Sequence, residues 1–125
     1  TACLANLAHS VTSIDIHDDF IATATKNLSD AGVDNVSLEC MDVMSELPDG
    51  MFDVIAMTCA VPEYHDAYTD LLKPGGRLFL IAGDHPVKSA LLVSKDEDGN
   101  IEMTELFETD APEIVNSETE KVFSF

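Results

Sequence analysis

The stretches FDVIAMT at residues 52–58 and LKPGGRLFLIAG at residues 72–83 decide how this chain folds. The first is an almost continuous apolar run, which is the pattern of a β-strand covered on both faces. In the second, a Pro-Gly turn leads into another apolar run, so a second strand is expected from Arg77 to Gly83. The residues between them, 63–72, follow Pro62 and carry inward-facing apolar side chains at helical spacing. The pattern therefore predicts a strand, a helix and a strand in succession.

The residues before this unit continue the same alternation. An Ala- and Leu-rich stretch at 1–8 predicts a helix, and β-branched runs at 11–16 and 36–40 predict two strands. Between these strands, Asp18 or Asp19 is expected to cap a helix that ends at Gly32. The apolar residues of that helix recur at helical spacing and are Phe20, Ile21, Ala24 and Leu28. A loop is expected from Met41 to Met51.

The residues after the unit predict a change of strand direction. Only 84–87 separate the strand ending at Gly83 from the apolar run at 88–95, which is too short a connection for a crossover helix. The next strand should therefore run antiparallel, and a turn at 96–100 should lead to its partner at 101–109. The fold class expected is α/β, a Rossmann-like doubly wound, mostly parallel sheet with a C-terminal antiparallel hairpin. We expect one partial domain over 1–125, with a core at 1–85 and the hairpin and tail at 86–125.

Composition excludes several classes of partner. The chain has 125 residues, with 24 Asp and Glu against 6 Lys and Arg, a formal net charge of -18. Nucleic acids and anionic membranes attract basic surfaces, so neither is an expected partner. No apolar run approaches the roughly 20 residues that cross a bilayer, and no signal peptide follows Thr1. Cys3, Cys40 and Cys59 are odd in number and lie among apolar neighbours, which predicts reduced, buried thiols in a cytoplasmic protein.

Candidate binding residues follow the strands, because ligands of such sheets lie beyond the carboxyl ends of the strands. Asp15 ends the first strand, where a carboxylate can accept both hydrogen bonds of a ribose diol; a helix-capping role suits it equally well. Asp42 with Val43 is placed to meet the amino group and face of an adenine, or is an ordinary loop Asp. The small residues 58–62 either admit a ligand or simply turn the chain.

Histidines lie beside carboxylates at two places, His17 with Asp18 and Asp19, and Asp84 with His85. A metal site needs three or four convergent ligands, which neither group supplies. We therefore expect no metal ion.

Taken in order, SIDIH at 13–17, NVSLECMD at 35–42, FDVIAMT and LKPGGRLFLIAG resemble the class I S-adenosylmethionine-dependent methyltransferases. Within that class the chain most resembles the protein-L-isoaspartate O-methyltransferase family. Members share the Ala-rich TA-x-LA helix, the acid at the end of a strand and the LKPGGRL turn. The closing stretch, ELFETDAPEIVN at 105–116, is similar to the tail of a bacterial branch of that family.

The resemblance implies a cofactor and a set of residues that bind it. S-adenosylmethionine is expected to contact Asp15, Ile16, Asp42, Val43 and Thr58. In the family a glycine-rich turn precedes the position of Thr1, and an amino-terminal region carries a substrate-binding hydroxyl residue; these would lie before the present chain. At Asp42 the family shows Gly-Asp-Gly, whereas Met41 and Val43 flank it here.

The resemblance also implies a reaction. The intact enzyme would transfer a methyl group from a sulfonium to the carboxylate of an L-isoaspartyl residue in a damaged protein, a step of protein repair. A carboxyl group is already ionised at neutral pH, so positioning and exclusion of water suffice, and no catalytic residue is expected among these 125. The alternatives are an NAD-dependent oxidoreductase fragment, because a strand-end Asp also binds NAD ribose, and a non-catalytic interaction module.

Overall fold

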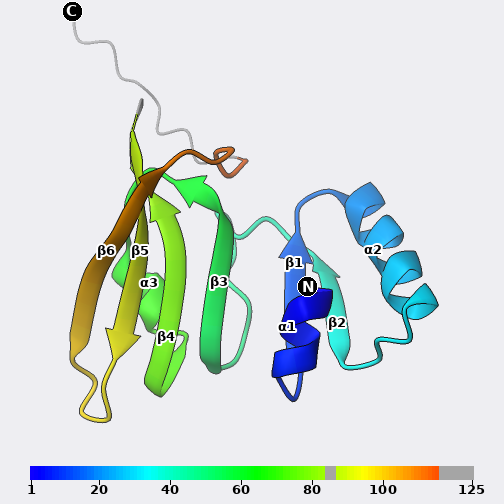
Figure 1. The fold of residues 1–125 in the computed structure, drawn as a ribbon, viewed down its shortest axis with the longest axis horizontal. Coiled ribbons are helices and arrows are strands. Elements are labelled where there is room, and N and C mark those ends of the chain that lie inside the picture. Colours follow the sequence, from blue (N-terminus) through cyan, green and yellow to red (C-terminus); the bar gives the residue numbers. More distant parts are fainter. Residues whose placement is uncertain (84–86, 116–125) are drawn as a thin grey trace, which may run out of the picture. The chain divides into compact units, whose positions relative to one another are not determined.

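The computed structural model describes residues 1–83 and 87–115 (Figure 1). Two compact units divide the chain, Thr1–Leu47 and Pro48–Phe125, and we call them unit 1 and unit 2. Each has its own sheet: β1 pairs with β2 in unit 1, and unit 2 has the strand order β3-β4-β5-β6. Within unit 2, β5 pairs with residues 77–82 of β4, on the two sides of the boundary expected after residue 85.

Unit 1 is a two-stranded parallel sheet with two helices. Its elements are α1 (Ala2–Leu7), β1 (Val11–Asp15), α2 (Asp18–Asp30) and β2 (Val36–Cys40). The expected helices and strands are confirmed, and Gly32, with φ of 71°, follows the end of α2 as expected. The expected cap is wrong, however, since His17 is the N-cap of α2. Asp18 and Asp19 lie in its first turn, where their negative charge interacts favourably with the positive end of the helix dipole.

Unit 2 carries the larger sheet. Its elements are β3 (Phe52–Val61), α3 (Asp66–Thr69), β4 (Leu72–Ala82), β5 (Lys88–Lys95) and β6 (Ile101–Thr109). β3 and β4 run parallel, while β4, β5 and β6 are successively antiparallel, which confirms the mixed sheet and its C-terminal hairpin. The loop 41–51 and the bounds of β5 and β6 are also as predicted.

The lengths expected for one helix and one strand of unit 2 are wrong. The strand expected from Arg77 to Gly83 is β4, which begins five residues earlier. The helix expected over 63–72 is the single turn α3, because β4 already begins at Leu72. Leu72 pairs with Phe52 and Arg77 pairs with Val54, so the residues between them, including the Pro-Gly turn, bulge from the ladder. Glycine is required there: Gly75 has a φ of 82°, and a Cβ on Gly76 would lie 2.8 Å from the carbonyl oxygen of Lys73.

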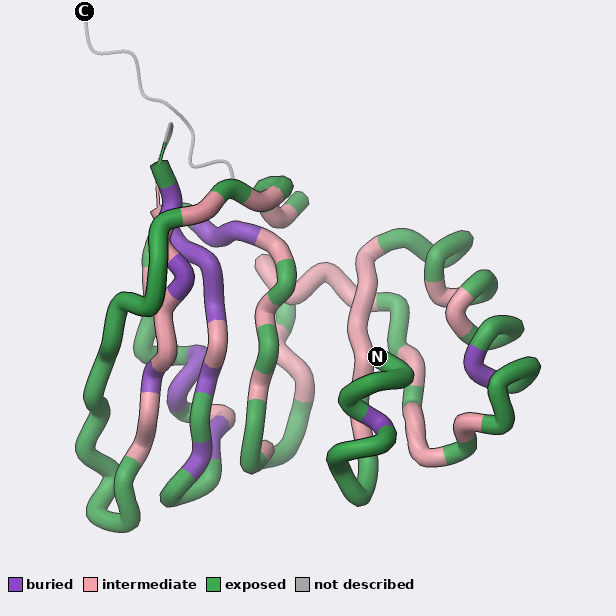
Figure 2. The backbone as a smooth tube through the Cα atoms, viewed as in Figure 1, coloured by how far each residue is buried: buried purple, intermediate pink, exposed green. Residues whose placement is uncertain are grey.

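The core lies in unit 2, on both faces of the central strands (Figure 2). Leu78 and Leu80 of β4 are fully buried, and so is Val93, which pairs with Leu78. On the other face Ala60, Ile81 and Ala90 form a small cluster. In unit 1, Ala5 and Leu28 are the buried apolar residues of the described chain. The central strands of unit 2 are therefore the best-packed part of the molecule.

The three cysteines are not buried as expected. Cys3 and Cys40 are exposed, Cys59 is half-buried, and none of the three forms a disulfide in the described chain. The apolar neighbours of Cys3 and Cys40 in the sequence do not cover them, because α1 and β2 belong to the thinly packed unit 1.

Candidate functional site

The carboxyl edge of the β1-β2 sheet brings four of the five predicted cofactor-binding residues together. Asp15 is the last residue of β1 and pairs with Cys40, the last residue of β2. The amide of Met41 donates to the carbonyl oxygen of Asp15 at 3.0 Å, so the chain leaves both strands side by side. Ile16 and Asp42 follow directly, and Val43 comes next. This edge is the candidate site of unit 1.

Asp15 is half-buried, and its carboxylate is oriented by the backbone. Oδ1 accepts a hydrogen bond from the amide of His17 at 2.9 Å. Oδ2 accepts no hydrogen bond within the described part of the chain. The carbonyl oxygen of Ile16 accepts from Sγ of Cys40 at 3.4 Å, which fixes the turn after β1 against the end of β2. The result is a positioned carboxylate with acceptor capacity left for a ligand hydroxyl.

Asp42 shapes its own loop. Its Oδ1 accepts from the amide of Met44 and its Oδ2 from Oγ of Ser45, each at 3.0 Å. Its carbonyl oxygen also accepts from the amides of Ser45 and Glu46, so the carboxylate closes a tight turn. The loop role that the sequence left open is thus present.

Thr58, the fifth candidate, belongs to unit 2 and does not follow its strand as expected. β3 continues to Val61, so Thr58 is an exposed residue within the strand. The cause is the ladder with β4, in which Ala60 pairs with Ile81 and Val61 pairs with Ala82. Ala60 donates to the carbonyl oxygen of Pro112 and accepts from the amide of Ile114, both at 2.8 Å. The segment after β6 thus adds an isolated bridge at Ala60, among residues predicted to form a turn, and the sequence did not reveal this pairing.

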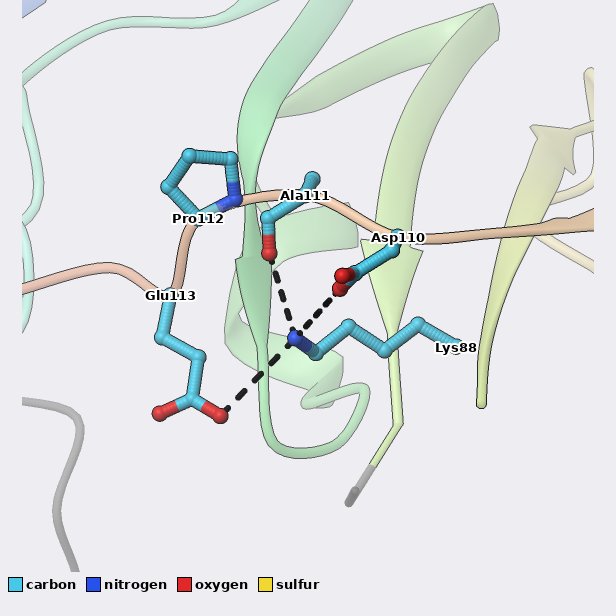
Figure 3. Close-up of a pocket in the computed structure, with 5 residues that line it drawn as sticks. All are labelled: Lys88, Asp110, Ala111, Pro112 and Glu113. Carbon is cyan, nitrogen blue, oxygen red and sulfur yellow. Dashed lines mark hydrogen bonds and ion pairs between the residues drawn. The ribbon is translucent and has the colours of Figure 1, made fainter. Parts of the chain in front are cut away.

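A lysine holds that segment in place, and sequence reasoning missed it. Lys88, the first residue of β5, has a side chain that is 2% exposed, and its Nζ donates to Oδ1 of Asp110 at 3.0 Å and to the carbonyl oxygen of Ala111 at 3.1 Å (Figure 3). Glu113 adds an ion pair at 3.8 Å. We call this group, with residues 110–114, the Lys88 latch. In Figure 1 the chain beyond β6 crosses the ends of β5 and β4 toward β3.

An open hollow of about 540 Å³ adjoins the Lys88 latch, lined by Lys88, Asp110, Ala111, Pro112 and Glu113. The ammonium group is already paired with two carboxylates, so the hollow offers no free positive charge to an anionic ligand. None of the predicted cofactor-binding residues lines it. The latch therefore acts as a structural support for the carboxyl end of β3.

Two tyrosines near α3 are the described groups with a raised pKa. Burial raises the pKa of Tyr64, whose hydroxyl is hydrogen-bonded to Oγ1 of Thr69 at 2.8 Å. Burial likewise raises the pKa of Tyr68, and the charge of Glu63 adds to the effect. Both side chains thus stay protonated at neutral pH and are unsuited to act as general bases.

Within residues 1–83 and 87–115, no group of three or more His, Cys, Asp and Glu side chains converges as a metal site would require. The pair Asp84 and His85 lies outside the described residues. Nor does any helix of the described chain have the length and apolar character needed to span a bilayer.

A sequence model of the protein-L-isoaspartate(D-aspartate) O-methyltransferase family matches residues 1–116. The chain belongs to this family. The curated relatives include protein-L-isoaspartate O-methyltransferase 2 of Syntrophobacter fumaroxidans, 36% identical over 100 residues, which are 78% of this chain and 40% of that protein. The enzyme of Koribacter versatilis is 34% identical over 106 residues, 84% of this chain and 47% of that protein. The chain thus spans less than half the length of these relatives.

Solved structures show the same fold. A methyltransferase of this family from Plasmodium falciparum, described as a complex with S-adenosyl-L-homocysteine, superposes with a TM-score of 0.72 at 16% identity. The match covers 84% of this chain and 52% of that one. A second protein-L-isoaspartate O-methyltransferase gives a TM-score of 0.74 at 23% identity, over 86% of this chain and 35% of that one. The predicted class I methyltransferase architecture is therefore confirmed for the part of the fold that the chain spans.

Proposed function

We propose that the whole protein transfers a methyl group from S-adenosylmethionine to the carboxylate of L-isoaspartyl residues in damaged proteins. The observation that carries the proposal is the family match over residues 1–116. It favours methyl transfer over the NAD-dependent alternative, since the family is defined by O-methylation. The substrate would be an isoaspartyl-containing protein or peptide.

The residues at the carboxyl edge of unit 1 suit the cofactor. Asp15 has an oriented carboxylate with an unused oxygen, which fits the two hydroxyls of a ribose. Ile16 and Val43 are half-buried apolar residues beside the two acids, which suits the flat face of an adenine. We propose these residues, with Asp42, as the S-adenosylmethionine site of unit 1. Thr58, which lies in β3, stays a prediction of the sequence.

The chemistry asks little of the protein. The cofactor supplies an electrophilic methyl group on a sulfonium, and the acceptor carboxylate is already ionised at neutral pH. The chain's part is to hold the cofactor in line with the acceptor and to exclude water. We therefore assign no catalytic residue within the chain. A single domain, a cytoplasmic location and a bacterial source stay predictions of the sequence.

Calorimetric titration of the full-length protein with S-adenosylmethionine and with NAD tests the proposal. Heat with S-adenosylmethionine only supports it, heat with NAD only contradicts it, and heat with neither ligand indicates an interaction module. Asp15→Ala should weaken S-adenosylmethionine binding about tenfold to a hundredfold, the effect of losing hydrogen bonds to a charged acceptor.

Asp30→Ala is the matched control, since Asp30 is an exposed Asp at the far end of α2. It should leave the dissociation constant unchanged. Equal effects of Asp15→Ala and Asp30→Ala would remove Asp15 from the site.

A further inference from the structure

The chain contains two Asp-Gly steps, Asp49-Gly50 and Asp98-Gly99. Both lie in unit 2, and all four residues are exposed. They share the Asp-Gly dipeptide but differ in the hydrogen bonds that restrain their backbone. The two steps can therefore be compared for a modification whose rate depends on backbone freedom.

Asp-Gly steps rearrange without any catalyst. The glycine nitrogen attacks the side-chain carboxyl carbon of Asp, a C–N bond forms, and water leaves with the hydroxyl of the carboxyl group and the proton of the amide. A five-membered imide results. Water then adds at the main-chain carbonyl and breaks the original peptide bond, so the chain continues through the side-chain carboxyl as isoaspartate, with no net change of mass. Glycine favours the attack because no Cβ shields its nitrogen.

The Asp98-Gly99 step is tied down by its turn. The amide of Gly99 donates to the carbonyl oxygen of Asp96 at 3.1 Å. Oδ1 of Asp96 accepts from the amides of Asp98 at 2.9 Å and Asn100 at 2.8 Å. The attacking nitrogen is thus engaged, and its neighbours on both sides are fixed. Ring closure at Asp98 requires this turn to open first.

The Asp49-Gly50 step has no such restraint. It lies in the loop between β2 and β3, and the amide of Gly50 makes no hydrogen bond within the described chain. Gly50 has a φ of 108°, and the nearest atom to a Cβ built on it is Cζ of Phe52, at 3.9 Å. The step therefore has room to reach the ring-closing geometry. We propose that Asp49 is the site at which this chain converts to isoaspartate, and that the Asp96 turn protects Asp98.

The conversion of Asp49 to isoaspartate does not depend on the proposed function, but its consequence for the enzyme does. Isoaspartate at position 49 would be the acceptor group that we propose for the enzyme. A molecule aged at this step would then become a substrate for an intact copy.

Ageing of the full-length protein in warm neutral buffer, followed by tryptic peptide mapping, tests the proposal. Arg77 lies between the two steps, so they fall in different peptides, and an isoaspartyl peptide separates from its parent at equal mass. Isoaspartate should accumulate at 49 at least about fivefold faster than at 98, the factor for one net hydrogen bond of about 1 kcal/mol. Equal or faster accumulation at 98 would overturn the proposal.

Two variants sharpen the test. Asp49→Glu keeps the charge but requires a larger ring, so the isoaspartyl signal of that peptide should disappear. Asp96→Ala releases the turn and should raise the rate at Asp98 about fivefold; an unchanged rate contradicts the protective role. Methyl incorporation into the aged protein is measured separately: isoaspartate at 49 without methylation supports the conversion and contradicts the proposed function.

Discussion

Units 1 and 2 are built from similar pieces but differ in packing. Unit 2 holds the five largest fully buried side chains of the described chain: Val61, Leu72, Leu78, Leu80 and Val93. Unit 1 has one parallel pair of strands, and its buried apolar residues are Ala5 and Leu28. Two strands alone are marginal in water, and parallel strands are usually covered on both faces. The proposed cofactor edge thus belongs to the unit with fewer buried apolar side chains, and we expect unit 1 to be the less stable of the two.

The largest expected effect on stability comes from shortening a buried side chain in the core of unit 2. Leu80 is fully buried, so Leu80→Ala should lower the free energy of unfolding by about 2–5 kcal/mol. Leu28→Ala in unit 1 is the matched variant and should cost less, because Leu28 is 9% exposed in a thinner layer. Denaturant titration gives both values. Equal losses would break the comparison between the two units.

Lys88→Met should have the next largest effect. Met has a side chain of similar length but no ammonium group, so the variant removes the donor to Asp110 and Ala111. Hydrogen bonds to charged groups contribute about 1.5–3 kcal/mol, so a loss of that size is expected. The amide of Ile114, which bonds to Ala60, should also exchange faster with solvent.

Lys73→Met is the control for the Lys88 latch. The pair of Lys73 with Asp53 is exposed and 3.5 Å long, so its loss should cost less than about 1 kcal/mol. A cost as large as that of Lys88→Met would show that burial of Lys88 adds nothing to the latch.

Salt should stabilise the chain, because both units carry a large excess of negative charge. Residues 1–47 carry eight carboxylate side chains and one lysine. Raising the ionic strength from about 0.01 M to about 0.15 M shortens the screening length from about 30 Å to about 8 Å. This weakens the repulsion between the carboxylates of the chain, and also their repulsion of an anionic methyl acceptor. The melting temperature should rise, as followed by circular dichroism. A falling melting temperature would contradict the expectation.

The smallest expected effect is a pH dependence of the Asp96 turn. Hydrogen bonds from the backbone and side chain of Asn100 lower the pKa of Asp96 below its ordinary value of 3.8. Because the folded pKa is the lower one, the stabilisation is present above the unfolded pKa and is lost as the pH falls through the folded pKa. A carboxyl-carbon NMR titration should place the midpoint below 3.8. A midpoint at or above that value would remove this contribution to the hairpin.

The sequence by itself determined the alternation of elements. The bounds of β2, β5 and β6 followed from local apolar runs and from turn residues such as Gly99, because the period of a strand and the geometry of a tight turn depend on neighbouring residues. Asp15 and Asp42 were likewise placed at the ends of their strands by local order alone.

Only the tertiary structure decided the rest. β3 extends to Val61 by pairing with β4, and its Ala60 bonds to Pro112 and Ile114. The latch joins Lys88 to residues more than twenty positions away. Burial of the cysteines could not be read from their neighbours, since cover comes from other elements. Backbone hydrogen bonds also separate Asp49 from Asp98, although both precede glycine. Each of these features depends on contacts between distant residues, and such contacts leave no periodic pattern in the sequence.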